Sequence, residues 1–448
     1  MATSLLSYAE AAEQVHRFII ALAAGGVVPL PDSADGPGSS DAATLPSLPP
    51  AGEPVLPEPV LPEMVPLSAA AGRVLASGIR ADRDQPPFPR STRDGFACRA
   101  AEANSHQFLF LAGQIRAGQQ PSAPVGKGEI WEIMTGAPVP DGADCVVMLE
   151  HVEHSTGFVR QQAPRTVAPG ENIVPRGAEA RAGDLLVPPG IRIASAQIAM
   201  AAQCGYGELA VYPRPRVGIL STGDELVSVE QVPGSSQIRN SNTPMLAALV
   251  AASGGSPLVV APVPDHPEAL DATFAEMLDP RQKLDLLLIT GGISVGKFDL
   301  VEDALTRAGA RFFFGGVAIQ PGKPVVFGQL ARPGRLPLPF FALPGNPISS
   351  AVTFQLFAAP LLTALADDSG QQPRFALARL AGGWQGKPGL TRFLPAWCDF
   401  LFEPTVRLIP WQGSGDIAAF ATSNCFLVVP QEASSLSDGS FVQILLRP

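Results

Sequence analysis

The chain has 448 residues, 46% of them hydrophobic, which is enough for roughly two to four domains with cores of ordinary size. Its formal net charge of −10 argues against a nucleic-acid-binding surface and favours a cytoplasmic protein. The five cysteines are far apart and include no C-x-x-C pair, so we expect buried thiols and neither a disulfide framework nor a zinc site. The apolar run 18–30 is too short to span a bilayer, and no membrane partner is expected.

The first part of the chain predicts helical structure interrupted by a proline-rich segment. Apolar residues recur with a helical period between Ser4 and Ala24, and a shorter helix is expected near residues 65–76. Residues 29–64 are rich in proline and are expected to be a mobile insertion, with a docking arm for a partner as the alternative. We expect residues 1–85 and 181–213 to form one helical, mixed domain that links its neighbours.

Residues 86–180 alternate short apolar runs with turns, which predicts a small inserted β domain. Two of its stretches, PPFPRSTRDGFA (86–97) and MTGAP (134–138), place polar side chains on loops shaped by glycine and proline. Loops of this kind carry binding and catalytic residues more often than other segments do, so Asp94 and Thr135 are candidate site residues. A plain turn at Asp94-Gly95 is the alternative interpretation.

Residues 214–368 alternate strands and helices, which predicts an α/β domain with a mostly parallel sheet. The expected strands are Val217–Leu220, Pro257–Val263, Leu284–Ile289 and Pro339–Leu343. The third strand stops at a glycine-rich turn before an expected helix over 298–308, so backbone N–H groups and a helix N-terminus meet there. This arrangement favours an anion site, although an ordinary strand-to-helix turn has the same pattern.

Polar side chains follow these strands, at the edge where ligands bind to parallel sheets. Carboxylates come from Asp224, Glu225, Asp265 and Asp299, and a cation from Lys323. Because carboxylates alone repel phosphate, we expect Glu225, Asp265 and Asp299 to hold Mg²⁺, which in turn binds phosphate oxygens. A helix-capping role for each aspartate is the alternative. The residues expected around the bound group are Thr222, Gly223, Gly291, Gly292, Ser294, Gly296, Pro344, Gly345 and Asn346.

Residues 372–448 return to short strands separated by glycine and proline turns. This pattern predicts a small β-barrel or sandwich. Only Arg392 and the turn Ser414-Gly415-Asp416 invite a functional interpretation in this part, and a surface arginine and an ordinary turn are favoured for them.

The longer motifs resemble those of one family. In order they read PPFPRSTRDGFA, IMTGAPVPDGADCVV, STGDEL, TGGISVGKFD, PGKP and LPGNPISS, and the resemblance covers residues 65–448. This set resembles the molybdopterin molybdenumtransferases, a family that includes the C-terminal domain of gephyrin. The resemblance implies an elongated, homodimeric subunit of four parts: a helical linking part, an inserted β domain, an α/β molybdopterin-binding domain and a C-terminal β-barrel. It also implies a reaction that takes adenylylated molybdopterin and molybdate, inserts molybdenum and releases AMP, as the final step of molybdenum cofactor biosynthesis.

The resemblance implies catalytic roles for residues that match the family motifs, namely Asp94, Thr135, Glu225, Asp265, Asp299 and Lys323. The first two match residues that reach the site across the dimer interface, and the three acids of the α/β domain are the expected Mg²⁺ ligands. Lys323 and Arg392 are candidates to attract molybdate, which is an anion. Molybdoenzymes and other proteins of the cofactor pathway are further candidate partners.

Four positions depart from the family pattern, and each removes or moves a charge. They are Arg93, where a small or apolar residue is usual, Ala178 and Asn240, where acids are usual, and Gln320, where a lysine is usual. These departures leave two alternatives open besides the transferase. One is a non-catalytic paralogue that binds or delivers the cofactor, and the other is an enzyme that prefers tungstate.

Overall fold

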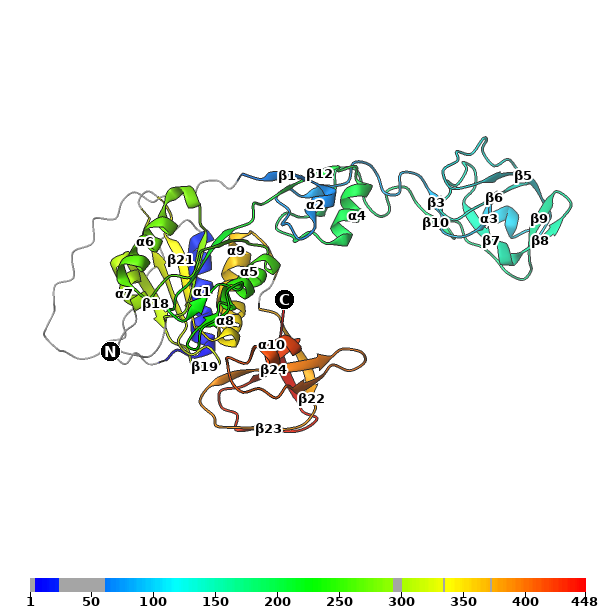
Figure 1. Ribbon diagram of the computed structural model, residues 1–448. Helices are drawn as coiled ribbons and strands as arrows, with labels where there is room; N and C mark the ends of the chain where they lie inside the picture. The colour runs from blue at the N-terminus through cyan, green and yellow to red at the C-terminus, as the bar shows by residue number, and fades with distance from the viewer. Residues whose placement is uncertain (1–4, 24–60, 293–299, 333–334, 371–372) are drawn as a thin grey trace, which may run out of the picture.

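The computed structural model describes residues 5–23, 61–292, 300–332, 335–370 and 373–448. Within this part of the chain the subunit is elongated (Figure 1). An α/β unit and a C-terminal barrel lie at one end, a small linking unit in the middle and an inserted β unit at the other end. The expected multidomain α/β architecture is therefore confirmed. Ser294, Gly296, Asp299 and most of the proline-rich segment 29–64 lie outside the described residues.

Six strands form the sheet of the α/β unit. In spatial order they are β16 (Ser256–Val259), β13 (Arg216–Ser221), β17 (Leu286–Thr290), β21 (Leu338–Leu343), β20 (Val326–Leu330) and β18 (Ala310–Gly315). The first four run parallel and β20 runs against both of its neighbours, so the mostly parallel sheet is confirmed. Strands β18 and β20 were not predicted, because they form an antiparallel edge that lacks the strand–helix alternation of the other four.

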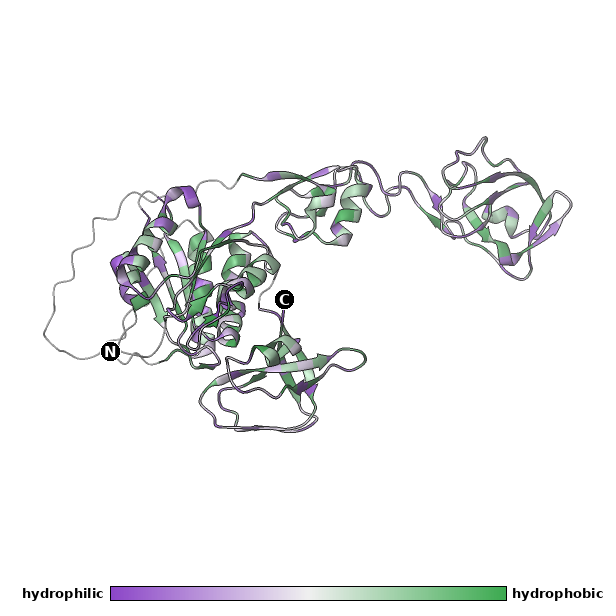
Figure 2. Cartoon of the chain, viewed as in Figure 1, coloured by the Kyte–Doolittle hydropathy of each residue, from purple (hydrophilic) through white to green (hydrophobic). Residues whose placement is uncertain are grey.

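Helices cover both faces of this sheet. One face carries α1 (Tyr8–Ala23), α5 (Asn242–Ala252) and α8 (Pro347–Thr353), and the other carries α6 (Pro267–Leu278) and α7 (Leu300–Arg307). Figure 2 shows hydrophobic residues concentrated along the sheet and polar residues on the outer helices. Every residue of β17 and β21 is buried as a result.

The helix α8 continues through a π-helical turn, Phe354–Ala358, into α9 (Ala359–Leu365). The whole stretch Pro347–Leu365 is long and apolar enough to cross a membrane by composition alone. However, 83% of its most apolar window is buried inside the protein, as is usual for the central helix of a core. Its apolar character is therefore explained by packing.

The helix α1 belongs to the α/β unit and not to the linking domain in which the sequence placed it. Ala11, Val15 and Phe18 are buried in the same core as β13 and β17, and the Phe18 ring packs edge-on against Phe327 with centroids 5.2 Å apart. An apolar helical stripe needs a large apolar face to cover. The α/β sheet offers such a face, whereas the core of the linking unit is small.

The linking unit is built from the two chain segments that flank the insertion. Its elements are β1 (Glu63–Pro66), α2 (Leu67–Ala70), β2 (Ile79–Arg80), β11 (Leu185–Val187), α4 (Ser195–Gln203) and β12 (Glu208–Val211). Strand β1 pairs with β12 and β2 with β11, so each pair joins residues from before and after the insertion. Backbone hydrogen bonds therefore join the segment that enters the inserted unit to the segment that leaves it.

The inserted unit is a six-stranded sheet with its own core. In spatial order its strands are β7 (Cys145–Met148), β4 (Gly95–Cys98), β6 (Glu129–Ile133), β5 (Leu109–Ile115), β9 (Phe158–Gln161) and β8 (Val152–Ser155). A short helix, α3 (Ala100–Ala103), follows β4, and the strands β3 (Arg90–Ser91) and β10 (Ile173–Val174) pair beside the sheet.

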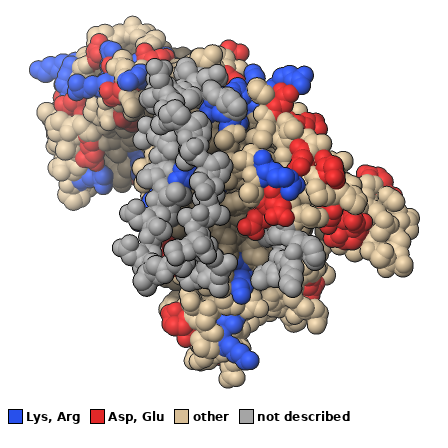
Figure 3. Space-filling model, turned by 90° about the vertical axis from the view of Figure 1, so that its left-hand side faces the viewer, with Lys and Arg blue, Asp and Glu red and all other residues tan. Residues whose placement is uncertain are grey.

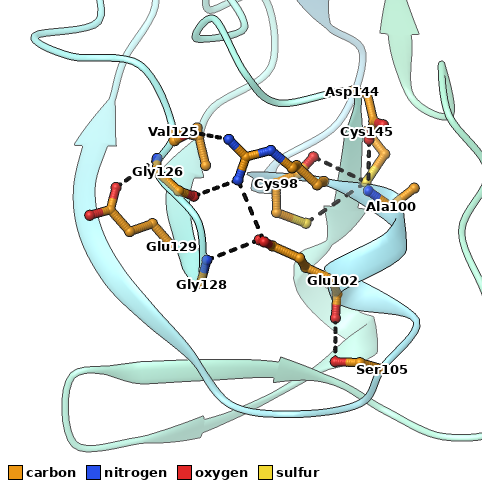
Figure 4. Close-up of polar contacts among 11 residues, drawn as sticks. Cys98, Ala100, Glu102, Ser105, Val125, Gly126, Gly128, Glu129, Asp144 and Cys145 are labelled. Atoms are coloured by element: carbon orange, nitrogen blue, oxygen red, sulfur yellow. Dashed lines mark hydrogen bonds and ion pairs between the residues drawn. The ribbon is translucent and has the colours of Figure 1, made fainter.

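A polar cluster surrounds the start of α3 (Figure 4). The Arg99 guanidinium donates to two loop carbonyl oxygens at 2.7 and 2.8 Å and forms an ion pair with Glu102 at 3.5 Å. Beside it the Cys98 and Cys145 thiols lie 3.8 Å apart, and this contact together with burial raises the pKa of Cys98. All five cysteines are free and buried, which confirms the expected buried thiols.

The C-terminal unit is a closed barrel, the first of the two forms that the sequence predicted. Its main strands are β22 (Phe375–Leu380), β24 (Thr391–Asp399), β25 (Thr405–Leu408), β26 (Cys425–Val429) and β28 (Phe441–Leu446). The order is β24-β25-β22-β28-β26, and β26 pairs back with β24 to close the ring. The short strand β19 (Ile319–Gln320) pairs with β24, so backbone pairing joins the α/β unit to the barrel.

The surface carries charges of both signs. On the face shown in Figure 3, the Lys and Arg side chains of the described residues are interspersed with Asp and Glu. No continuous basic area forms among the described residues on that face. This face therefore carries mixed charge over the described residues.

Candidate functional site

The segments that follow β13 and β17 meet at the carboxyl edge of the sheet, where the sequence placed the site. β13 ends at Ser221 and β17 at Thr290, and these two residues are paired in register. Just beyond, the Thr222 N–H donates to the Thr290 carbonyl oxygen at 2.9 Å, and the Gly223 N–H donates to that of Val263 at 3.3 Å. The strand ends therefore lie side by side, as a parallel sheet requires.

The glycines of the two turns leave little room for a side chain. Gly291 has φ +96°, and a Cβ there would lie 2.2 Å from the Thr222 carbonyl oxygen. At Gly292, with φ +64°, a Cβ would lie 2.8 Å from Thr222 Oγ1. On the other turn, a Cβ at Gly223 would lie 2.5 Å from a carboxylate oxygen of Glu225. Gly291 thus packs against backbone, Gly292 packs against side chains, and the Glu225 carboxylate lies over Gly223 in its own turn.

A buried network fixes the turn after β21 against the turn after β17. The Asn242 side-chain N–H₂ donates to Thr290 Oγ1 at 2.9 Å and to the Gly345 carbonyl oxygen at 2.6 Å. The hydroxyls of Thr290 and Ser350 lie 3.2 Å apart, and the Ser350 hydroxyl also donates to the Pro344 carbonyl oxygen. Pro344 and Gly345 were predicted members of the site. Asn242 and Ser350 were missed, because a polar residue in the first turn of a helix is equally well explained as a cap.

Three oxygen atoms at this edge are buried and have no hydrogen-bond partner among the described residues. They are Thr222 Oγ1, Asn242 Oδ1 and Asp265 Oδ1. Buried polar atoms in native proteins are almost always paired, and leaving one unpaired costs about 1–3 kcal/mol. One hydroxyl and two acceptor oxygens without standard partners, within one group of loops, are the arrangement expected where a ligand or a cation completes the site.

Burial and repulsion between neighbouring carboxylates at this edge disfavour the ionised form of Asp265. The Asp265 N–H donates to Asp224 Oδ1 at 3.1 Å. Burial, then the Asp224 charge, raise the pKa of Asp265, and the Glu225 charge adds to the shift. The Thr222 hydroxyl partly offsets it, although no hydrogen bond of standard geometry joins the two side chains. A carboxylate whose charge is disfavoured in this way is suited to bind a cation.

The oxygen donors present suit a hard cation such as Mg²⁺, which prefers carboxylate and other oxygen ligands. The set predicted to hold it was Glu225, Asp265 and Asp299, and Asp299 lies outside the described residues. Within the described residues, no group of three or more His, Cys, Asp or Glu side chains is arranged to hold a metal ion. Glu225 and Asp265 are thus the only members of the predicted set that lie within the described residues.

The barrel contacts the α/β unit beside the PGKP loop, residues 321–324. Because β19 pairs with β24, Gln320 lies opposite Arg392. A cavity of about 370 Å³ opens beside this pair, and its polar and aromatic lining comes from Gln320, Trp384, Lys387, Arg392 and Trp411. The Arg392 guanidinium lies over the Trp384 ring at 5.5 Å from the centroid, as in a cation–π contact.

The sequence singled out Arg392 but missed Trp384, Lys387 and Trp411 in this cavity. They stand in or beside turns of an apolar strand pattern, where nothing in the sequence marks them. Lys323 lies three residues after Gln320, is exposed, and is not part of the cavity lining.

The turn Ser414-Gly415-Asp416 of the barrel packs against the first turn of α8. The Ile348 N–H, in the first turn of α8, donates to the Ser414 carbonyl oxygen at 3.0 Å, so this turn lies beside Asn346. Asp416 accepts from the Ala419 N–H and caps the helix α10 (Ile417–Thr422), and these backbone bonds lower its pKa. The structural role favoured for this aspartate is confirmed.

Asp94 and Thr135 lie together but far from the sheet edge. Asp94 Oδ1 accepts from the Thr135 N–H at 2.7 Å and from its hydroxyl at 2.9 Å, and these bonds lower the pKa of Asp94. Both residues belong to the inserted unit, at the opposite end of the subunit from the α/β unit (Figure 1). Within one chain, Asp94 and Thr135 therefore contact each other but lie far from Asp265.

Comparisons with known proteins account for nearly the whole chain. Residues 43–205 match the MoeA N-terminal region (domain I and II), residues 218–364 match a probable molybdopterin binding domain, and residues 377–446 match the MoeA C-terminal region (domain IV). A molybdopterin molybdenumtransferase of Nostoc sp. is 33% identical over 88% of this chain and 91% of its own length. That of Bacillus subtilis is 33% identical over 86% of this chain and 89% of its own length.

The chain belongs to the molybdopterin molybdenumtransferase family. A solved structure of the molybdopterin biosynthesis MoeA protein from Pyrococcus horikoshii agrees with this assignment. It is 30% identical, covers 86% of this chain and 94% of its own, and superimposes with a TM-score of 0.66.

One of the departures from the molybdenumtransferase pattern, Asn240, has a local structural explanation, and nothing in the structure explains Ala178. Asn240 is buried, and its side-chain N–H₂ donates to Ser221 Oγ at 2.8 Å and to Thr243 Oγ1 at 2.9 Å. Its Oδ1 accepts from the Thr243 N–H at 3.2 Å, so the neutral amide satisfies both sides of a neutral network. Beside Ala178, Glu179 forms an ion pair with Arg90 at 2.7 Å.

The other two departures lie on the surface. Arg93 is exposed and has no ion pair among the described residues. Its backbone is held by the Ser91 hydroxyl, which donates to the Arg93 carbonyl oxygen at 2.6 Å. Gln320 places an uncharged amide in the barrel cavity where the family pattern has a lysine. The cavity keeps its positive charge through Arg392 and Lys387.

Proposed function

We propose that this chain inserts molybdenum from molybdate into adenylylated molybdopterin and releases AMP, in the final step of molybdenum cofactor biosynthesis. The observation that carries the proposal is the carboxyl edge of the sheet, where a glycine-rich turn meets the carboxylates of Asp224, Glu225 and Asp265. Three buried oxygen atoms there have no hydrogen-bond partner among the described residues. Parallel sheets bind their ligands at this edge. We assign the reaction to the cytoplasm, in keeping with the acidic, disulfide-free chain.

At this edge the carboxylates bind the cation and the glycine-rich turn binds the anionic phosphates. Glu225 and Asp265, with Asp299, hold Mg²⁺, which when bound polarises the phosphoanhydride and offsets its charge. The backbone N–H groups of the Gly291-Gly292 turn bind the phosphate oxygens, as in other glycine-rich strand-to-helix turns. Both glycines have positive φ, which gives the turn this backbone course. The network through Thr290 keeps this geometry fixed before the substrate arrives.

Molybdate binds on the barrel side of the site. Arg392 and Lys387 line the cavity there, and Lys323 lies in the adjoining loop. Arg392 is held against Trp384, so its guanidinium is presented with little loss of side-chain freedom. A fixed guanidinium suits an oxyanion through its planar set of donors.

The protein works as a homodimer whose sites are shared. Asp94 and Thr135 are the paired polar residues of the inserted unit, and within one chain they lie at the far end of the subunit from Asp265. A second copy related by two-fold symmetry supplies them to the site. We include molybdoenzymes and other proteins of the cofactor pathway among its partners.

The decisive experiment measures AMP release and formation of active cofactor by the full chain with adenylylated molybdopterin, Mg²⁺ and molybdate. Both products are expected, and Glu225→Ala is expected to abolish them without loss of folding, because Glu225 is an exposed loop residue. Glu268→Ala, an exposed acid in the first turn of α6, is the matched control and is expected to retain activity. Substrate that binds and is never cleaved refutes the transferase in favour of a non-catalytic carrier.

A competition assay with tungstate separates the two oxyanions. If the protein is a molybdenum enzyme, equimolar tungstate leaves most of the product as molybdenum cofactor. A product that contains mainly tungsten identifies the tungstate-preferring alternative.

The shared site has its own test. Asp94→Asn and Asp265→Asn are each expected to be inactive, but co-expressed subunits are expected to recover about a quarter of the wild-type rate. About half of the dimers are then mixed, and each mixed dimer has one intact site. Lack of recovery above either variant alone refutes the shared site and leaves the other assignments in place.

A further inference from the structure

A second cavity, of about 160 Å³, lies at the junction of the α/β unit, the linking unit and the end of the barrel. Its polar lining includes Arg192, Ser253, Gln355 and Arg374. Ser253 follows the last residue of α5, whose first residue, Asn242, belongs to the carboxyl edge described above. A helix of 11 residues is about 16 Å long. The cavity is therefore at the opposite edge of the sheet from the molybdopterin site.

Gln355 gives this cavity an unsatisfied polar wall. The residue is 3% exposed, and neither its Oε1 nor its Nε2 has a hydrogen-bond partner among the described residues. It lies in the π-helical turn Phe354–Ala358, and such turns interrupt helices frequently at functional sites. A ligand that offers a donor beside an acceptor would satisfy both ends of such an amide at once.

The two arginines of the cavity differ in their availability. Arg192 is fully engaged: it donates to Asp368 at 2.8 Å, to the Gly72 carbonyl oxygen at 2.9 Å and to that of Ser253 at 3.0 Å. Arg374 is exposed, and no carboxylate of the described residues forms an ion pair with it. The free positive charge of the cavity is therefore that of Arg374.

We propose that this cavity binds a small planar organic acid that carries an N–H beside a C=O. The N–H and C=O edge pairs with the Gln355 amide, and the carboxylate pairs with the Arg374 guanidinium. The volume sets the size, since a cavity of about 150 Å³ admits a benzene ring. Molybdate does not fit this role, because it carries no hydrogen to donate to Gln355 Oε1. The proposal does not depend on the reaction at the other edge.

Titration calorimetry on the full chain tests the proposal with three matched probes. Orotate has both the carboxylate and the N–H/C=O edge, uracil has only the edge, and benzoate has only the carboxylate. Orotate is expected to bind at least tenfold more tightly than the other two, which is about 1.4 kcal/mol. Gln355→Leu and Arg374→Met are each expected to weaken orotate binding at least tenfold, and Arg407→Met, an exposed barrel arginine outside the cavity, is expected to leave it unchanged.

Three outcomes overturn the proposal. One is the absence of saturable orotate binding up to about 10 mM, which corresponds to a negligible affinity. Another is binding of benzoate as tight as that of orotate, which would show that the Gln355 amide does not contact the ligand. The third is orotate binding that Arg374→Met does not alter. Because Arg374 is exposed, that variant is expected to fold even where the buried Gln355→Leu does not.

Discussion

Asp265→Asn is expected to raise stability and to lower activity by about 10²–10³ at the same time. The amide has the shape of the carboxylate but not its charge. Burial, then Asp224, raise the pKa of Asp265, so its folded pKa lies above the unfolded value. The ionised form therefore destabilises the fold above that pKa, and this cost disappears as pH falls and the carboxyl is protonated. Removing the charge removes the cost at neutral pH.

The two effects differ in size. Asp265 is half-buried and solvent screens its repulsion with Asp224, so the gain in unfolding free energy is at most about 1 kcal/mol. The loss of activity is larger, because the charge acts where phosphate charge develops. Removing one such electrostatic contact typically costs about 10²–10³ in rate, or roughly 2.7–4 kcal/mol.

Thermal unfolding without Mg²⁺ and AMP release with Mg²⁺ measure the two quantities. The thermal midpoint of Asp265→Asn is expected above that of the wild type at pH 7, with the difference shrinking as pH falls through the pKa of Asp265. Asp271→Asn is the control, since Asp271 lies on α6 and forms an exposed ion pair with Arg307 at 2.9 Å. Wild-type turnover in Asp265→Asn would refute its role at the site. A lower midpoint at pH 7 would refute the charge repulsion.

Three further substitutions test the local geometry. Thr135→Val removes the hydroxyl bond to Asp94 and keeps the N–H bond, so the pKa of Asp94, followed by NMR titration, is expected to rise toward its ordinary value; an unchanged pKa would contradict this. Gly291→Ala places a Cβ about 2.2 Å from the Thr222 carbonyl oxygen at φ +96°, and is expected to cost about 2 kcal/mol or more, measured as a lower thermal midpoint. Asn240→Leu breaks three buried hydrogen bonds and is expected to cost about 2–4 kcal/mol in urea unfolding.

Local sequence determined the parts of this protein that depend on short-range chemistry. The alternation of apolar strands and amphipathic helices predicted the parallel strands, because each element must bury one face or both. The tight turn at Thr290-Gly291-Gly292 was predictable too, because glycine readily adopts the positive φ that this backbone course needs. Its role as an anion site stays a prediction. The order of the motifs also indicated the family, which the comparisons confirm.

Contacts between residues far apart in sequence were decided only by the tertiary structure. The sequence placed α1 in the linking domain, because its stripe shows that the helix buries a face but not which face it meets. The Asn242–Thr290–Ser350 network and the Trp384–Arg392 wall join residues whose sequence neighbours carry no sign of the contact. The sequence predicted Asp94 for the site of a partner copy, and the elongated fold accordingly holds it at the opposite end of the chain from Asp265. Side chains become neighbours through packing of whole elements, and local patterns leave that arrangement undetermined.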